Sequence, residues 1–187
     1  MEEKLALLEA RISELKKVHR PVLVALEGGS AAGKSTLGAA LATRLGATLV
    51  HMDDFFLPPE LRTEARFAQP GGNVHYERVK AEVMEPLAAG RAPEYGVFDC
   101  SKMAVGHTVR EEVRDVVIVE GAYALHPELR DFFHLKVLVT VDPDTQRERI
   151  RKRNGEQMLR RFLEEWIPLE QTYFEACAVK ACCDIIL

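Results

Sequence analysis

Apolar and polar positions form blocks along the chain, and these blocks predict helices and short buried strands in turn. Leucine and isoleucine recur at intervals of three and four residues over 4–18, with charged residues between them. This spacing predicts an amphipathic helix that ends before Pro21. The segment 22–26 is short, apolar and β-branched and runs into a glycine-rich stretch, which predicts a buried parallel strand. A helix is expected over 33–45, ended by Gly46.

The same order of strand and helix continues through the rest of the chain. Strands are expected near 48–52, at 116–119, at 136–141 and at 184–187, and helices near 76–89, at 143–153 and at 158–181. Repeated strand-then-helix order predicts a three-layer α/β fold, in which helices cover both faces of a mostly parallel sheet.

Residues 93–113 break this alternation. Two short runs with apolar residues, 95–99 and 107–109, flank a turn-like middle that contains Gly106. This pattern predicts an inserted β-hairpin that is able to reach over a site. We expect a single domain over 1–187, with the N-terminal helix in 1–19, the hairpin in 93–113 and a basic helical lid in 143–160.

The composition is that of an ordinary globular protein and narrows the function classes. The 25 basic and 29 acidic residues give a formal charge of −4, which disfavours broad nucleic-acid binding. The four cysteines include no C-x-x-C pair, so we expect reduced thiols and no zinc site. No apolar run approaches the roughly 20 residues of a membrane span, and the first residues lack the layout of a signal peptide. We therefore expect a cytoplasmic protein with no membrane partner.

A glycine-rich loop follows the first predicted strand and matches G-x-x-x-x-G-K-[ST] without a mismatch. Its residues are Gly28, Gly29, Ser30, Ala31, Ala32, Gly33, Lys34 and Ser35. Such a loop folds back so that backbone N–H groups and the next helix N-terminus converge on phosphate oxygens. Lys34 is expected to reach the β- and γ-phosphate oxygens and Ser35 to offer its hydroxyl to Mg²⁺, with Thr36 beside it. A turn that binds nothing would explain neither Lys34 nor Ser35 at these offsets.

Acidic residues follow two of the predicted strands. Asp53 and Asp54 come after the second strand, and Glu120 ends the strand at 116–119. In a parallel sheet these carboxyl ends lie at one edge, beside the phosphate loop. Asp53 is expected to accept the proton of an attacking hydroxyl and to help anchor the metal, and Glu120 to join the metal shell. Helix capping and ordinary turn chemistry are the alternatives.

A basic run covers 146–153, shortly after the strand at 136–141. Arg149 and Arg153 are four residues apart and share a helix face. A helix that carries arginines can close on the transferring phosphoryl group, supply positive charge and expel water. The alternative is a solvated face. No N-K-x-D motif is present, and Glu120-Gly121 is not the D-x-x-G of a GTPase switch, so a kinase is favoured.

The order of these motifs resembles that of uridine kinase-like proteins, in the phosphoribulokinase/uridine kinase division of P-loop kinases. The resemblance covers about 22–187 and includes the phosphate loop, His-Met-Asp-Asp-Phe-Phe at 51–56, Gly-Gly-Asn at 71–73, the hairpin at 95–99, the segment 118–121, the basic run and Asp-Ile-Ile at 184–186. It implies ATP and Mg²⁺, a proton acceptor at Asp53 and lid arginines at Arg149 and Arg153. It also implies transfer to the 5′-hydroxyl of a ribonucleoside.

Several residues are expected around the acceptor. They are Asp53, Phe56, His75, Tyr95, Phe98 and Asp99. His75 stands where many relatives place an acidic residue that binds ribose hydroxyls, and Phe98 where uridine kinases tend to place a tyrosine. His75 is alternatively a surface histidine, and Tyr95 and Phe98 alternatively pack the hairpin.

The sequence thus predicts a P-loop kinase that moves the γ-phosphoryl group of ATP to a hydroxyl of a small, nucleoside-like molecule. A kinase of the same fold for another alcohol, such as nicotinamide riboside, pantothenate or a sugar, is one alternative. A nucleotide-dependent switch or binding module without an acceptor is another. The N-terminal helix has two expected partners, its own sheet or a second copy in a homo-oligomer.

Overall fold

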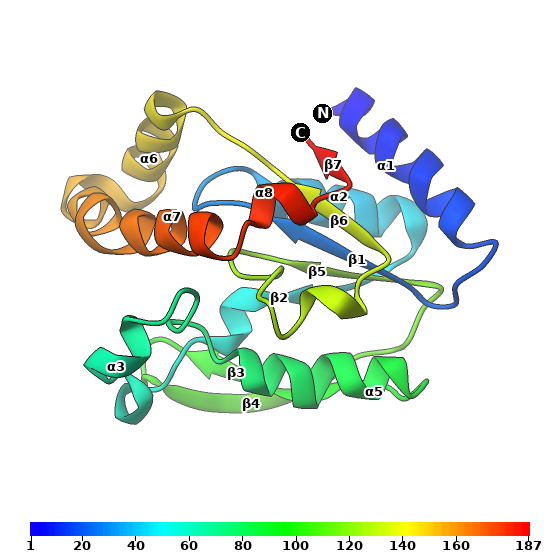
Figure 1. Ribbon diagram of the computed structural model, residues 1–187, viewed down its shortest axis with the longest axis horizontal. Helices are drawn as coiled ribbons and strands as arrows, with labels where there is room; N and C mark the ends of the chain where they lie inside the picture. The colour runs from blue at the N-terminus through cyan, green and yellow to red at the C-terminus, as the bar shows by residue number, and fades with distance from the viewer.

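A five-stranded parallel sheet forms the middle layer of the computed structural model, which describes residues 1–187 (Figure 1). The strand order is β2-β5-β1-β6-β7. The strands are β1 (Val22–Glu27), β2 (Thr48–His51), β5 (Val116–Glu120), β6 (Leu135–Leu138) and β7 (Ile185–Ile186). The central strands β1 and β5 are buried along their whole length, as their unbroken apolar runs predict. The predicted α/β fold with a mostly parallel sheet is confirmed.

One face of the sheet is covered by α1 (Glu2–Leu15) and α2 (Lys34–Leu45). Leu5, Leu8 and Ile12 of α1 are buried in one cluster with Val22 and Val24 of β1. The N-terminal helix therefore packs within its own chain, which was one of its two expected positions. Val18 lies beyond the end of α1 and is exposed, so the helix is shorter than the apolar spacing predicted.

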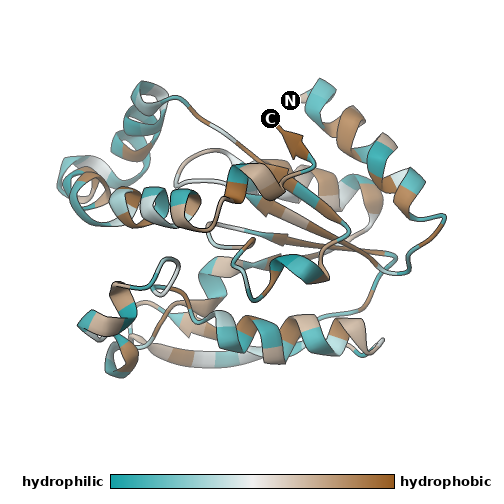
Figure 2. Cartoon of the chain, viewed as in Figure 1, coloured by the Kyte–Doolittle hydropathy of each residue, from teal (hydrophilic) through white to brown (hydrophobic).

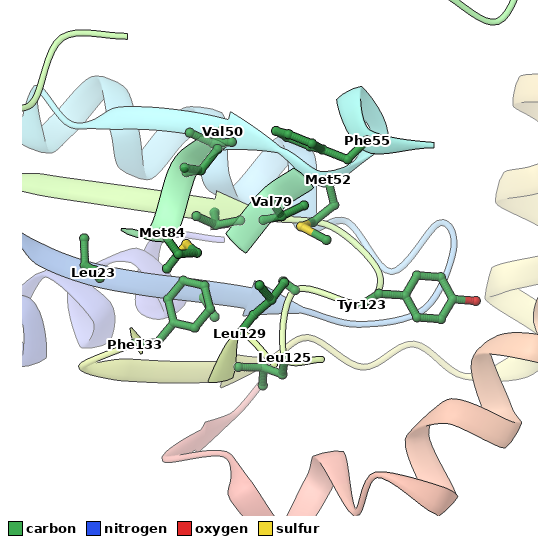
Figure 3. Close-up of a cluster of buried hydrophobic side chains, with 14 of the residues drawn as sticks. Leu23, Val50, Met52, Phe55, Val79, Met84, Tyr123, Leu125, Leu129 and Phe133 are labelled. Atoms are coloured by element: carbon green, nitrogen blue, oxygen red, sulfur yellow. The ribbon is translucent and has the colours of Figure 1, made fainter. Parts of the chain in front are cut away.

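One continuous helical segment covers part of the opposite face, beside the segment 123–133 and residues of the C-terminal helices. It comprises α4 (Tyr76–Arg78), η3 (Val79–Met84) and α5 (Glu85–Ala88). Val79, Val83 and Leu87 of this segment share a buried cluster with Leu23 and Ala25 of β1. Figure 3 labels Val79 and Leu23 of this cluster. Successive residues of β1 thus enter opposite cores, because strand side chains alternate between the faces of a sheet. Figure 2 shows the apolar colouring concentrated on the central strands.

The predicted hairpin is present as a separate antiparallel pair below the main sheet in Figure 1, formed by β3 (Glu94–Asp99) and β4 (Ala104–Arg110). β3 contacts η1 (Met52–Phe55), the turn that follows β2. The guanidinium group of Arg78 donates a hydrogen bond to the Gly96 carbonyl at 2.7 Å. The hairpin is thereby joined to both the helical layer and the end of β2. The short elements η2 (Pro59–Leu61) and α3 (Glu64–Phe67) precede α4.

The helices of the C-terminal third are η4 (Arg130–Phe132), α6 (Pro143–Arg161), η5 (Phe162–Trp166), α7 (Ile167–Ala176) and α8 (Val179–Cys182). Gly155 interrupts α6 with a φ of 81° and a ψ of 171°, which separates the basic helix from the next amphipathic stretch as predicted. Two predicted boundaries are wrong. β6 ends at Leu138 because the chain then turns toward Asp142, which caps α6, and the helix expected over 158–181 ends at Ala176. No helix is both long and apolar enough to cross the bilayer.

Candidate active site

The phosphate loop connects β1 to α2 at the carboxyl edge of the sheet. Gly28 requires glycine, because a Cβ atom there would lie 2.3 Å from the Val139 carbonyl oxygen. Gly33 begins α2 with a φ of 98°, and Ala31 lies in the left-handed region with a φ of 57°. The Lys34 ammonium donates to the Gly29 carbonyl at 2.8 Å, and the side chain is 8% exposed. The loop thus places the N-terminus of α2 and a buried positive charge side by side.

Glu120 lies next to this loop, at the carboxyl end of β5. One carboxylate oxygen accepts a hydrogen bond from the Ser35 hydroxyl at 3.1 Å, and the other lies 2.6 Å from His51 Nδ1. The pKa of His51 is raised, chiefly by this contact with Glu120. His51 was missed by the sequence analysis, although it pairs directly with Glu120 in the register of β2 and β5. Thr36 is exposed on the first turn of α2.

The donor set suits magnesium better than a softer metal. Ser35 and Glu120 offer oxygen atoms, which Mg²⁺ prefers, and Asp53 supplies another carboxylate nearby. The structure has no group of three or more histidine, cysteine or acidic side chains that could hold a metal ion. Mg²⁺ is usually held by one or two carboxylates together with substrate phosphates and waters.

Asp53 lies on η1, immediately after β2. The residue is exposed to solvent, but neighbouring protein atoms partly desolvate its carboxyl group. Desolvation and the neighbouring Glu120 carboxylate raise the pKa of Asp53, while Lys34, His51 and Arg153 oppose the rise. The structure thus brings Asp53 within electrostatic reach of Lys34 and Glu120. Its role as a base stays a prediction.

The basic helix α6 lies against the phosphate loop. Arg149 donates to the Ala31 carbonyl at 3.1 Å, and Gln146 donates to the Ser30 carbonyl at 2.7 Å. Arg153 has no such contact: it donates to the Asn154 side chain and lies over the Phe162 ring. Of the two arginines expected in the lid, Arg149 contacts the loop, and the positive charge of Arg153 lowers the pKa of Asp53.

The residues expected around the acceptor are only partly available to a ligand. Phe56 is 37% exposed and meets the buried Phe98 ring edge-on, with the ring centroids 6.0 Å apart. Tyr95 is buried against Phe55, so the structure places it in hairpin packing and not on an open face. Asp99 accepts hydrogen bonds from the Ser101 N–H and hydroxyl, which lower its pKa to about 2. Its carboxylate therefore holds the hairpin turn.

His75 lies at the start of α4 and is half-buried. Its backbone N–H donates to the Phe55 carbonyl at 2.9 Å, which ties it to the turn that carries Asp53. Its Nδ1 atom is buried without a hydrogen-bond partner, and burial lowers the pKa of the imidazole. His75 is thus joined to the end of η1, the element that carries Asp53, and its role in acceptor binding stays a prediction.

Glu27, at the end of β1, is a site residue that the sequence analysis missed. Its carboxylate accepts hydrogen bonds from the backbone N–H groups of Gly28, Tyr123 and Leu125 and from the Tyr173 hydroxyl, at 2.8–3.1 Å. It therefore joins the phosphate loop to the turn after β5, where Tyr123 has a φ of 71°, and to α7. Figure 3 shows the Tyr123 hydroxyl pointing away from the other labelled side chains. Glu27 could have been found from the sequence, because it is a charged residue at the end of an otherwise apolar strand and needs hydrogen-bond partners when buried.

Replacing Glu27 with glutamine is expected to lower the free energy of unfolding by about 1–3 kcal/mol at pH 5. At this pH the carboxyl group is protonated and places one O–H among four groups that donate to it, whereas the amide places two N–H donors there. Burial raises the pKa of Glu27 from 4.5 to about 7. Because the pKa of Glu27 is higher in the folded than in the unfolded protein, its contribution to the free energy of unfolding is complete below about pH 4.5. This contribution is lost as the pH rises through about 7. The difference between wild type and Glu27→Gln should therefore narrow over this interval.

Urea denaturation between pH 4.5 and 8 measures this difference. Glu175→Gln is a matched control, since Glu175 is exposed on α7. A Glu27→Gln protein with the stability and pH dependence of wild type would show that the four hydrogen bonds contribute nothing.

The chain is similar in sequence to several uridine kinases. No protein-family model matches the chain. The uridine kinase of Chloroflexus aggregans is 31% identical over 134 residues, which are 66% of this chain and 63% of that enzyme, less than two thirds of its length. The uridine kinase of Streptococcus agalactiae is 28% identical over 74% of this chain and 70% of its own. The uridine kinase of Clostridium perfringens is 25% identical over 90% of this chain and 87% of its own.

Two solved structures share the fold. A possible uridine kinase from Bacillus stearothermophilus superposes with a TM-score of 0.72 at 19% identity, covering 96% of this chain and 98% of its own. A protein assigned as a fructose transport system kinase from Silicibacter also has a TM-score of 0.72, at 24% identity, covering 98% of both chains. The chain has the α/β fold of P-loop NTPases. Within that fold, the predicted resemblance to uridine kinase-like P-loop kinases is confirmed.

Proposed function

We propose that this protein is an ATP-dependent small-molecule kinase whose acceptor is the 5′-hydroxyl of a nucleoside such as uridine or cytidine. The observation that carries the proposal is the meeting of three groups at one sheet edge. Lys34 lies in the phosphate loop, Glu120 accepts the Ser35 hydroxyl, and Asp53 lies within the electrostatic reach of both Lys34 and Glu120. The similarity to several uridine kinases supports a nucleoside as the acceptor.

Each group has a defined task in phosphoryl transfer. Loop N–H groups and Lys34 bind the triphosphate, and Ser35 and Glu120 would hold Mg²⁺, which neutralises phosphate charge when bound. The acceptor oxygen forms a bond to the γ-phosphorus, the bond from that phosphorus to the bridging oxygen breaks, and ADP leaves. Asp53 takes the hydroxyl proton. Arg149 and Arg153 offset the charge on the transferring group as the lid closes.

A second acceptor class is favoured by His75. It stands where the resemblance places an acidic residue that binds ribose hydroxyls, and in this structure it is a half-buried imidazole with a lowered pKa. Its Nδ1 atom is buried, which leaves only Nε2 for a ligand, whereas a carboxylate accepts two hydroxyl protons. This difference favours a kinase of the same fold whose acceptor lacks a ribose diol, such as pantothenate.

A screen of ADP formation from ATP and Mg²⁺ tests these acceptors. Purified protein is incubated with nucleosides, vitamins and sugars one at a time, and Lys34→Ala protein is run in parallel to exclude contaminating kinases. We expect turnover that depends on uridine or cytidine. Turnover that depends on another alcohol would select the second class, and turnover indifferent to every acceptor would indicate a nucleotide-dependent switch or binding module.

A further inference from the structure

A carboxylate from the C-terminal helices reaches into the phosphate loop. Glu170 of α7 accepts the Ser30 backbone N–H at 2.9 Å with one oxygen and the Ser30 hydroxyl at 2.5 Å with the other. Glu170 is 5% exposed, so these bonds are shielded from competing water. Charge-assisted hydrogen bonds of this kind are about twice as strong as neutral ones. No step of the proposed reaction uses Glu170.

Ser30 also forms a hydrogen bond with α6. The Ser30 carbonyl accepts a hydrogen bond from Gln146 of α6 at 2.7 Å. The N–H, hydroxyl and carbonyl groups of Ser30 therefore all form hydrogen bonds with α6 or α7. Ser30 is the only residue of the phosphate loop whose N–H, side chain and carbonyl all contact these two helices.

Ala31, the next residue of the loop, has a backbone conformation that needs these contacts. Ala31 carries a Cβ atom and still has a φ of 57°, a left-handed conformation that costs energy for any residue other than glycine. Strained backbone persists only where its surroundings fix it. Ser30 fixes the N-terminal side of Ala31, and the Ala31 carbonyl is held by Arg149 at 3.1 Å. The loop conformation thus depends on contacts that come from more than 100 residues away along the chain.

We propose that Glu170 is a positioning residue of the phosphate loop, which acts on the nucleotide through Ser30. It fixes the direction of the Ser30 N–H group and hydroxyl and so holds the loop in the shape that receives the triphosphate. Tyr173, one turn later on α7, donates its hydroxyl to Glu27 at the start of the same loop and keeps α7 in register with it. Lys34 lies close enough to Glu170 to offset its negative charge.

Three substitutions separate the contact from the charge. Glu170→Asp keeps the charge but draws the carboxylate away from Ser30 by one methylene. Glu170→Gln loses the charge but keeps an oxygen that can accept the Ser30 N–H, and Glu170→Ala loses both. Glu175→Ala, on the exposed side of α7, is the matched control.

The measurement is equilibrium binding of ATP with Mg²⁺ by titration calorimetry, together with steady-state KM for ATP and kcat. We expect Glu170→Ala and Glu170→Asp to raise Kd and KM for ATP about tenfold or more, as two charge-assisted hydrogen bonds are lost. Glu170→Gln and Glu175→Ala should stay within about threefold of wild type, and kcat at saturating ATP should change little in all four. Adding Ser30→Ala to Glu170→Ala should cost no more than Glu170→Ala alone, because both act through one contact.

The inference rests on the proposed function, and the two fail in different ways. Wild-type protein that binds no ATP would refute the function and the inference with it. Wild-type binding with an unchanged Kd in Glu170→Asp would overturn the inference alone. Tighter binding in both Glu170→Gln and Glu170→Ala would also overturn it, since the carboxylate would then oppose the nucleotide by its charge. If thermal unfolding shows that Glu170→Ala does not fold, the Kd values for ATP of Glu170→Asp and Glu170→Gln still test the inference.

Discussion

Lys34→Ala is expected to reduce kcat about 10³-fold or more under saturating ATP and acceptor. Lys34 is the positive charge that the phosphate loop places beside the N-terminus of α2, and its ammonium group is already held there by the Gly29 carbonyl. Negative charge on the transferring phosphoryl group is stabilised by such a fixed charge at no reorganisation cost. Removal of comparable fixed charges in phosphoryl transfer costs about 10³–10⁵ in rate.

The change also affects the stability of the fold. The positive charge of Lys34 lowers the pKa of Glu27, Asp53 and Glu170, so its removal leaves these carboxylates without that charge and should lower thermal stability. Thermal unfolding of Lys34→Ala, measured in parallel, shows that the protein is still folded at the assay temperature and so separates a loss of chemistry from a loss of structure. Lys180→Ala, an exposed lysine on α8, is the matched control and should keep full activity. Turnover of Lys34→Ala within tenfold of wild type would remove this lysine from the mechanism.

The arrangement of the central sheet could be predicted because its determinants are local. Leu5, Leu8 and Ile12 recur at helical spacing and form one buried helix face. The apolar run of β1 is short and unbroken, which is typical of a strand buried on both faces. Strand-then-helix order requires parallel pairing, which places the ends of β2 and β5 at one edge. Asp53 and Glu120 follow those ends, so their proximity to the phosphate loop followed from topology.

The contacts that complete the site could not be predicted in this way. Glu170 and Ser30 are 140 residues apart, and no periodicity along the chain links them. Tyr173 shows the same limit, since its helical spacing predicts burial but not that its hydroxyl meets Glu27. Tyr95 packs on Phe55, which was its alternative expected position, because the apolar area of an aromatic ring gains more from the core than from solvent. Pairs of this kind are set by how α7 and the hairpin pack on the sheet.

Asp53→Asn is expected to lower kcat about 10²-fold or more while the affinity for ATP changes little. The reason is that an amide oxygen cannot take the proton of the acceptor hydroxyl, and general-base catalysis usually contributes 10²–10⁴ in rate. Asp53 makes no hydrogen bond to the phosphate loop, so the loop should keep its shape in the variant. Titration calorimetry with ATP and Mg²⁺, run beside initial-rate measurements, separates the two effects.

The pH dependence of kcat provides a second test of the same residue. Burial and Glu120 raise the pKa of Asp53 above its ordinary 3.8, which favours the protonated form that cannot act as a base. Wild-type kcat should therefore fall as the pH is lowered through this raised pKa, and the fall should be absent from the residual activity of Asp53→Asn. Asp54→Asn is the matched control, since it changes the adjacent carboxylate on the same turn and should leave kcat within about threefold. If Asp54→Asn loses activity and Asp53→Asn keeps it, the residue that takes the hydroxyl proton is Asp54 and not Asp53.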